Sequence, residues 1–221
     1  MAGDAVAEGE SRKAVGVVLR SSAKTVHFIR HAEGTHNKAA KEEGREAYDK
    51  EEHFDARLTD FGNEQCAALK ATGHGIEKEA QLVVVSPLTR AIETAIRTVD
   101  QVDGVPWIAL ECVRERSGNH PCDRRRSIQE LKLEFPNIDF DAIEDDTDVH
   151  WASLNERETN EALTARGHEL LEWISSRPET NIAVVTHSAY LLCLFNNAIL
   201  SPPHIAKWFE NCELRTVLLD V

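Results

Sequence analysis

The pattern of apolar and polar positions alternates between strand-like and helix-like segments along most of the chain. Short apolar runs rich in β-branched residues predict strands; they cover residues 25–29, 81–85, 107–110 and 181–186. Apolar residues at helical spacing predict helices after these runs; they cover residues 59–71, 88–99 and 189–200, and a further helix that starts at Thr159 or Thr164 and ends at Ser176. Strands that alternate with helices imply a mostly parallel sheet between two helix layers. We therefore expect an α/β fold, a three-layer sandwich.

The remaining segments carry other patterns. Residues 38–55 are polar and charged, which predicts a long exposed excursion, and residues 139–148 are acidic, which indicates a solvated loop. Residues 127–135 and 204–210 predict short helices. Residues 214–219 predict a last strand.

The same pattern predicts one domain. We expect it to cover residues 23–221, with residues 118–155 as an insertion over the edge of the sheet that carries the site. Residues 1–22 mix charged and small residues and predict a flexible tail. The only apolar run in that tail, Val15–Leu19, is too short for a secretory signal or a membrane span.

The composition limits the classes of molecule that the protein is expected to bind. The 221 residues carry a net charge of −13, which argues against a nucleic-acid or membrane partner. The five cysteines are odd in number and widely spaced, as expected for reduced thiols in a cytoplasmic protein. A small anionic substrate then requires a locally basic pocket. The sequence makes no prediction of the oligomeric state.

Charged and titratable side chains follow the predicted strands at their carboxyl ends. Because the carboxyl ends of parallel strands meet at one edge of a sheet, we expect these groups to converge there. In chain order they are Arg30 with His31, Arg90, Glu115 and His187. Asn37 follows the first pair closely and adds an amide donor.

This set of side chains suits phosphoryl transfer through histidine. A neutral His31 can attack phosphorus while Arg30 and Arg90 neutralise the charge on the equatorial oxygens. The same two cations lower the pKa of His31. His187, if protonated, donates to a non-bridging oxygen. Glu115, if protonated, gives its proton to the leaving oxygen and then activates water. We expect no metal and no cofactor.

Four sequence blocks carry a resemblance to a known family. In chain order they are RHAEGTHN, SPLTRAIETA, RERSG and VVTHSA. They resemble the RHG signature, the second phosphate-binding block, the acid–base block and the second catalytic histidine of the histidine phosphatase, or phosphoglycerate mutase-like, superfamily. The resemblance covers residues 24–219 and implies the phosphoglycerate mutase-like fold. The plant and fungal phosphoglycerate mutase-like proteins are more narrowly similar through RHAEGTHN, FDARLT, GNHPCDRRRS and FENCELRTV.

The resemblance also implies roles for single residues. By this resemblance, His31 is the phosphorylated nucleophile and Glu115 is the proton donor. The resemblance also implies a phosphate pocket that consists of Arg30, Asn37, Arg90 and His187. Ala32 replaces the glycine of the RHG signature, as it does in the narrower group. Glu115 lies three residues before Gly118, whereas the glycolytic mutases space the corresponding pair one residue further apart. Glu111 is therefore a rival proton donor, and we prefer Glu115.

Two other groups of side chains allow a second interpretation. His36 and His53 could join His31 in a metal site, but their spacing fits no common zinc pattern, so we expect no metal there. The run Arg124–Arg126 follows the acid–base block. It is either a solvated charge run or a site for a second anionic group on the substrate.

Three functions are compatible with these residues: a phosphomonoester hydrolase acting on small phosphorylated metabolites, a cofactor-dependent phosphoglycerate mutase, and a phosphate-binding regulatory protein without turnover. Regulatory relatives usually lose the nucleophile or an arginine, and this chain keeps both. Glycolytic mutases seal the site with a tail beyond the last core strand, whereas this sequence stops at Val221, directly after the last predicted strand. We therefore expect the hydrolase.

Overall fold

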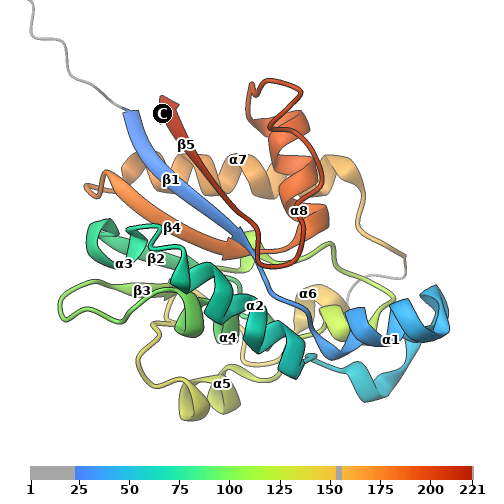
Figure 1. Ribbon diagram of the computed structural model, residues 1–221. Helices are drawn as coiled ribbons and strands as arrows, with labels where there is room; N and C mark the ends of the chain where they lie inside the picture. Colours follow the sequence, from blue (N-terminus) through green and yellow to red (C-terminus); the bar gives the residue numbers. More distant parts are fainter. Residues whose placement is uncertain (1–22, 153–155, 221) are drawn as a thin grey trace, which may run out of the picture.

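The computed structural model describes residues 23–152 and 156–220, so the predicted tail at residues 1–22 lies outside the described part. Five strands form one sheet in the order β3-β2-β4-β1-β5 (Figure 1). They are β1 (Ala23–Arg30), β2 (Leu82–Val85), β3 (Trp107–Ala109), β4 (Asn181–Thr186) and β5 (Leu214–Asp220). β5 runs antiparallel to β1, and the other pairs are parallel. The expected mostly parallel sheet is confirmed.

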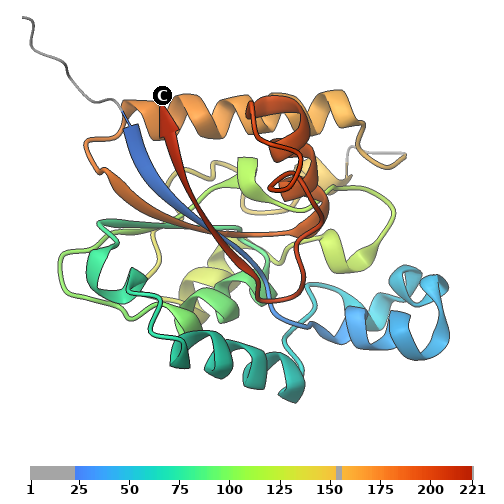
Figure 2. The same ribbon diagram turned by 45° about the horizontal axis from the view of Figure 1, so that its top comes forward.

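Helices cover both faces of the sheet, as Figures 1 and 2 show. One layer consists of α7 (Asn160–Ser176) and α8 (Ser188–Cys193), which continues as a π-helical turn over Leu194–Ala198. The opposite layer contains α2 (Asp60–Ala71), α4 (Thr89–Thr98) and α5 (Ile128–Glu134). The other α-helices are α1 (Thr35–Glu43), α3 (Ile76–Glu79) and α6 (Val149–Ala152). No helix in the described ranges combines the length and the apolar character needed to cross a lipid bilayer.

The two helix layers explain why the strands are continuously apolar. Successive side chains of a strand point to opposite faces of its sheet. Val84 of β2 therefore joins the core that contains Leu170 of α7, while Val85 joins the core that contains Ile92 of α4. All four side chains are fully buried. The sheet is covered on both faces, as the apolar runs predict.

Capping residues fix the starts of three helices. The Thr59 hydroxyl accepts a hydrogen bond from the backbone N–H of the third residue of α2 at 3.0 Å. Thr159 caps α7 in the same way. Ser127 and Glu130 form a reciprocal capping box at α5. The predicted helices therefore begin where their local sequence allows.

Most of residues 38–55 are exposed, as their polar sequence predicts, but the segment is folded into helical turns. After α1 the chain makes two 3₁₀ turns, η1 (Arg45–Asp49) and η2 (Glu51–His53). The small side chains of Ala39 and Ala47 are buried and anchor these turns. Two alanines give almost no periodic signal, which is why the sequence did not indicate these turns.

Residues 204–210 do not form the predicted helix. Several of their backbone carbonyls accept hydrogen bonds from arginine side chains, so a regular helix is not needed to satisfy them. Arg215 donates to the carbonyls of Ile205, Lys207 and Trp208 at 2.6–2.8 Å, and Arg30 donates to that of Phe209 at 2.7 Å. The loop consequently passes beside the carboxyl end of β1.

The acidic residues 139–148 are mostly exposed, as predicted, but buried side chains anchor the segment. Phe140 and Ile143 are buried, and Asp148 is buried at the end of the segment. Asp148 accepts hydrogen bonds from both terminal nitrogens of the buried Arg114 guanidinium, at 2.8 and 2.5 Å. This ion pair ties the segment to the loop after β3.

Candidate active site

A cavity of about 460 Å³ lies at the carboxyl edge of the sheet. Five of the six residues predicted for the site line it: Arg30, His31, Asn37, Arg90 and Glu115. The sixth, His187, is fully buried beside His31, with 5.0 Å between the ring centroids. The strand register explains this proximity, because Arg30 of β1 pairs with Thr186 of β4 and the two histidines follow directly.

The hydrogen bonds of His31 determine which of its ring nitrogens carries the proton. Nδ1 lies 2.7 Å from the carbonyl oxygen of Ala32, which can only accept, so Nδ1 carries the proton in the neutral ring. The other nitrogen, Nε2, then presents a lone pair, and Arg90 Nε lies 3.3 Å from it. Burial, followed by the charges of Arg90 and Arg30, holds the pKa of His31 well below its ordinary value of 6.5. The direction expected from the two cations is confirmed, with burial as the larger cause.

The Arg90 guanidinium is held in place by the loop after β3. It is almost fully buried and donates to the carbonyl oxygen of Cys122 and, at 3.0 Å, to Asp123 Oδ1. Asp123 Oδ2 accepts a second ion pair from Arg157 at 2.7 Å. A buried cation needs such a partner. Asp123 therefore fixes Arg90 beside the nucleophile, a role that its position in an irregular loop did not reveal.

Arg30 and Asn37 supply further N–H donors to the cavity. Arg30 donates through one terminal nitrogen to the Phe209 carbonyl, and its buried Nε has no partner in the described part of the chain. Asn37 Oδ1 accepts the backbone N–H of Gly34 at 3.1 Å, which orients the amide. The structure shows no hydrogen bond from the Asn37 amide nitrogen to the residues it describes. Both side chains are thus arranged to donate to an oxyanion.

His187 is neutral in this site. Its pKa is held well below 6.5 by burial and then by Arg90, with His31 adding to the effect. Nε2 lies 2.7 Å from the hydroxyl oxygen of Ser86, while the buried Nδ1 has no partner among the described residues. A neutral imidazole still donates one N–H. Ser86, which follows β2, is a further positioning residue that the sequence did not indicate.

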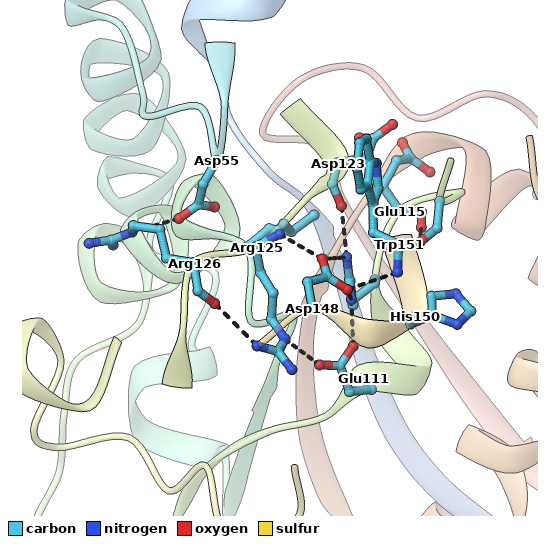
Figure 3. Close-up of polar contacts among 12 residues, drawn as sticks. Asp55, Glu111, Glu115, Asp123, Arg125, Arg126, Asp148, His150 and Trp151 are labelled. Atoms are coloured by element: carbon cyan, nitrogen blue, oxygen red, sulfur yellow. Dashed lines mark hydrogen bonds and ion pairs between the residues drawn. The ribbon is translucent and has the colours of Figure 1, made fainter. Parts of the chain in front are cut away.

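The structure separates the two rival carboxylates. Glu115 lines the cavity, and its oxygens accept backbone N–H groups of Ala189 and Tyr190, in the first turn of α8, at 3.2 and 3.1 Å. Glu111 lies away from this cavity and pairs with the guanidinium groups of Arg114 and Arg125 (Figure 3). The geometry supports Glu115 as the proton donor.

The three arginines that follow the acid–base block do not line the cavity. Figure 3 shows Arg125 directed at Glu111 and Arg126 near Asp55. Arg125 is buried and also donates to backbone carbonyls of residues 145–147. The carboxylate partners of the run are Glu51 for Arg124, Glu111 for Arg125, and Asp55 and Glu134 for Arg126. These three arginines hold neighbouring loops together through ion pairs. The run is therefore neither a solvated charge run nor a site for a second anionic group of the substrate.

Several residues that the sequence analysis did not assign to a substrate site line the cavity. His36 reaches it from α1, and Arg45 and Tyr48 reach it from η1, within the segment predicted to be an exposed excursion. His36 is buried, and its pKa is held well below 6.5 by burial, Arg90 and neighbouring histidines. Among the described residues, no three His, Cys, Asp or Glu side chains are grouped so that they could hold a metal ion.

Comparisons with known proteins agree with this geometry. The family model described as "Histidine phosphatase superfamily (branch 1)" matches residues 26–220. A phosphoglycerate mutase-like protein of Arabidopsis thaliana is 35% identical over 93% of this chain and 88% of its own length. The fold resembles that of a putative alpha-ribazole-5'-P phosphatase from Escherichia coli, with a TM-score of 0.59, 22% identity, and 87% and 89% of the two chains covered. It also resembles a phosphoglycerate mutase from Bacillus anthracis, with a TM-score of 0.59, 17% identity, and 90% and 89% covered.

Proposed function

This chain belongs to the histidine phosphatase superfamily, and from that premise we propose that it hydrolyses phosphomonoesters of small metabolites through a phosphohistidine intermediate. The observation that carries the proposal is the state of His31. Its Nε2 lone pair is free of a proton, lies beside Arg90 and belongs to a side chain that lines the cavity. A neutral imidazole held between two cations is suited to attack a phosphoryl group.

In the first step, His31 Nε2 attacks phosphorus and the bond from phosphorus to the ester oxygen breaks. Arg30, Arg90, Asn37 and His187 donate to the equatorial oxygens, whose charge is the main target of catalysis. Glu115, when it carries a proton, gives that proton to the leaving oxygen, so the alcohol departs uncharged.

In the second step, the Glu115 carboxylate takes a proton from water as the water oxygen attacks the phosphohistidine. The bond from Nε2 to phosphorus breaks, inorganic phosphate forms and His31 returns to its starting state. Glu115 is held for both roles by hydrogen bonds from the first turn of α8. One carboxyl group therefore serves as acid and then as base.

The mouth of the cavity supports hydrolysis over a mutase reaction. Lys41 and Arg45 line the cavity and are also exposed to solvent. A mouth open to solvent favours the entry of water, which a mutase must exclude from its phosphohistidine. The similar proteins include both phosphatases and mutases by name. The preference for hydrolysis therefore rests on the cavity and not on these names.

Release of inorganic phosphate from para-nitrophenyl phosphate tests the proposal. We expect the purified protein to catalyse it and His31→Ala to lose at least about a thousandfold in kcat, in line with the loss of a covalent nucleophile. The exposed His168 of α7 provides the matched control, because His168→Ala leaves the cavity intact. Full activity in a folded His31→Ala would overturn the mechanism. Phosphate binding without release by the unaltered protein would favour the regulatory alternative.

A further inference from the structure

Among the basic side chains that line the cavity, Arg45 has neither a partner in the described part of the chain nor a role in the proposed reaction. Five cations line it: Arg30, Lys41, Arg45, Arg90 and Arg157. Lys41 pairs with Glu33, and Arg90 and Arg157 share Asp123. In the proposed reaction, Arg30 donates hydrogen bonds to the phosphoryl group beside His31. Within the described part of the chain, the Arg45 side chain makes no ion pair or hydrogen bond.

The position of Arg45 follows from the turn that carries it. Arg45 and Tyr48 stand three residues apart in the 3₁₀ turn η1, and side chains at this spacing eclipse one another. Both therefore lie on one face of η1, and both line the cavity. The Tyr48 hydroxyl has no partner among the residues that the structure describes.

Tyr48 also belongs to a row of rings that leads away from the nucleophile. The centroids of His31 and His36 are 5.7 Å apart, those of His36 and Tyr48 5.8 Å, and those of Tyr48 and His120 5.5 Å. Exposure increases along the row, from 1% for His31 and 3% for His36 to 25% for the His120 side chain. The row therefore runs from the reacting centre toward the mouth, and Arg45 lines the same cavity from the turn that carries Tyr48.

We propose that Arg45 and the Tyr48 hydroxyl bind a second anionic group, a carboxylate or a phosphate, on the alcohol part of the substrate. This inference rests on the phosphatase function proposed above. An unpaired guanidinium presents a planar fork that matches such a group. The cavity volume of about 460 Å³ falls in the range of sites for whole small molecules, so the alcohol part also fits inside. The preferred substrates are thus phosphomonoesters with a second anion.

Competition against para-nitrophenyl phosphate hydrolysis provides the test. Three matched pairs of esters serve as inhibitors, and within each pair only one member carries a second anionic group. Two pairs add a carboxylate: glycerol 3-phosphate with 3-phosphoglycerate, and glucose 6-phosphate with 6-phosphogluconate. The third pair, fructose 6-phosphate with fructose 1,6-bisphosphate, adds a phosphate. The pair with the largest ratio of inhibition constants identifies the second anion.

We expect the doubly anionic member to bind more tightly in at least one pair. Arg45→Ala should reduce that ratio about tenfold, the effect of losing one charge-assisted hydrogen bond at a solvated site, and Arg45→Lys should keep part of it. Arg124→Ala is the matched control, because Arg124 lies outside the cavity and pairs with Glu51, and it should leave the ratio unchanged. A general disturbance of the site would weaken both members of a pair and leave their ratio unchanged.

Two results would overturn the inference: no preference for a second anion in any pair, or a preference that Arg45→Ala leaves intact. Either result, obtained with an enzyme that hydrolyses para-nitrophenyl phosphate, leaves the proposed phosphatase function standing. Absence of that hydrolysis in the unaltered protein would instead contradict the proposed function itself.

Discussion

At the scale of single residues, His31 shows how neighbours determine the chemistry of one side chain. An exposed histidine is partly protonated near neutral pH. Burial and two arginines hold the His31 pKa well below 6.5, so the ring is neutral at neutral pH. The Ala32 carbonyl then selects the tautomer in which Nε2 carries no proton and accepts a hydrogen bond from Arg90. The protein thus prepares a nucleophile without a separate base.

Glu115 carries the first prediction. If it protonates the leaving group, Glu115→Gln should reduce kcat for an alkyl phosphate by about a hundredfold to ten-thousandfold, and much less for an aryl phosphate, which needs no proton to leave. Steady-state kinetics with glycerol 3-phosphate and para-nitrophenyl phosphate measure this contrast. Glu111→Gln is the control, because Glu111 lies away from the cavity and the amide keeps an acceptor for Arg114. The same contrast in Glu111→Gln, and not in Glu115→Gln, would reverse the assignment.

At the scale of elements, the sequence predicts those strands, and the site residues directly after them, that follow from the local pattern of apolar residues. The strands that carry the site are buried on both faces, so their apolar runs stand out, and the residues that follow them are placed by the sheet register. His31 and His187 could therefore be brought together from sequence alone. Thr59 could likewise be identified as a cap from its neighbours.

Contacts between distant segments explain what the sequence could not predict. Arg45 and Tyr48 reach the cavity because η1 packs beside it, and no local pattern encodes that placement. The Arg215 guanidinium donates hydrogen bonds to backbone carbonyls of residues 204–210, a segment whose sequence predicts a helix. Arg125 is basic yet buried, because the carbonyls and the carboxylate around it come from two other segments.

The buried pair of Asp148 and Arg114 gives a prediction at this scale. Asp148→Ala leaves the Arg114 guanidinium buried without its bidentate partner, and we expect it to lower the free energy of unfolding by about 3 kcal/mol. Asp145→Ala, in the same acidic segment but with an exposed side chain, should change it by less than about 0.5 kcal/mol. Urea denaturation compares the two variants. Equal effects would show that the pair does not anchor the segment.

At the scale of the whole molecule, the charge of the surface and that of the site are opposed. The chain carries a net charge of −13, yet five cations and three carboxylates line the cavity. The net charge of the chain disfavours the approach of anions, whereas the lining of the cavity carries more cations than carboxylates. This local contrast is what a small anionic substrate requires.

The buried histidines make the stability of the molecule depend on pH. The pKa values of His31, His36 and His187 are held below 6.5 in the folded protein, so the unfolded chain binds more protons as the pH falls through 6.5 and below. Stability is then lost on the acid side, by up to about 1.4 kcal/mol per pH unit for each group. Urea denaturation between pH 7.5 and 5.5 should show a falling free energy of unfolding.

A matched pair of variants tests the source of that loss. His36→Gln removes one of the three groups and should make the pH dependence shallower, whereas His168→Gln replaces an exposed histidine of α7 and should leave it unchanged. A free energy of unfolding that stays constant across this pH range, or rises as the pH falls, would contradict the assignment of neutral buried rings.

The central claim is that His31 carries the phosphoryl group during turnover. Rapid quenching of the enzyme with radiolabelled phosphomonoester, followed by digestion and mass spectrometry, tests it most directly. We predict a label that is stable in alkali, labile in acid and located on Nε2 of His31, and we predict that His31→Ala acquires none. An enzyme that releases phosphate while His31 stays unlabelled at every quench time, or a label on another side chain, would contradict the account.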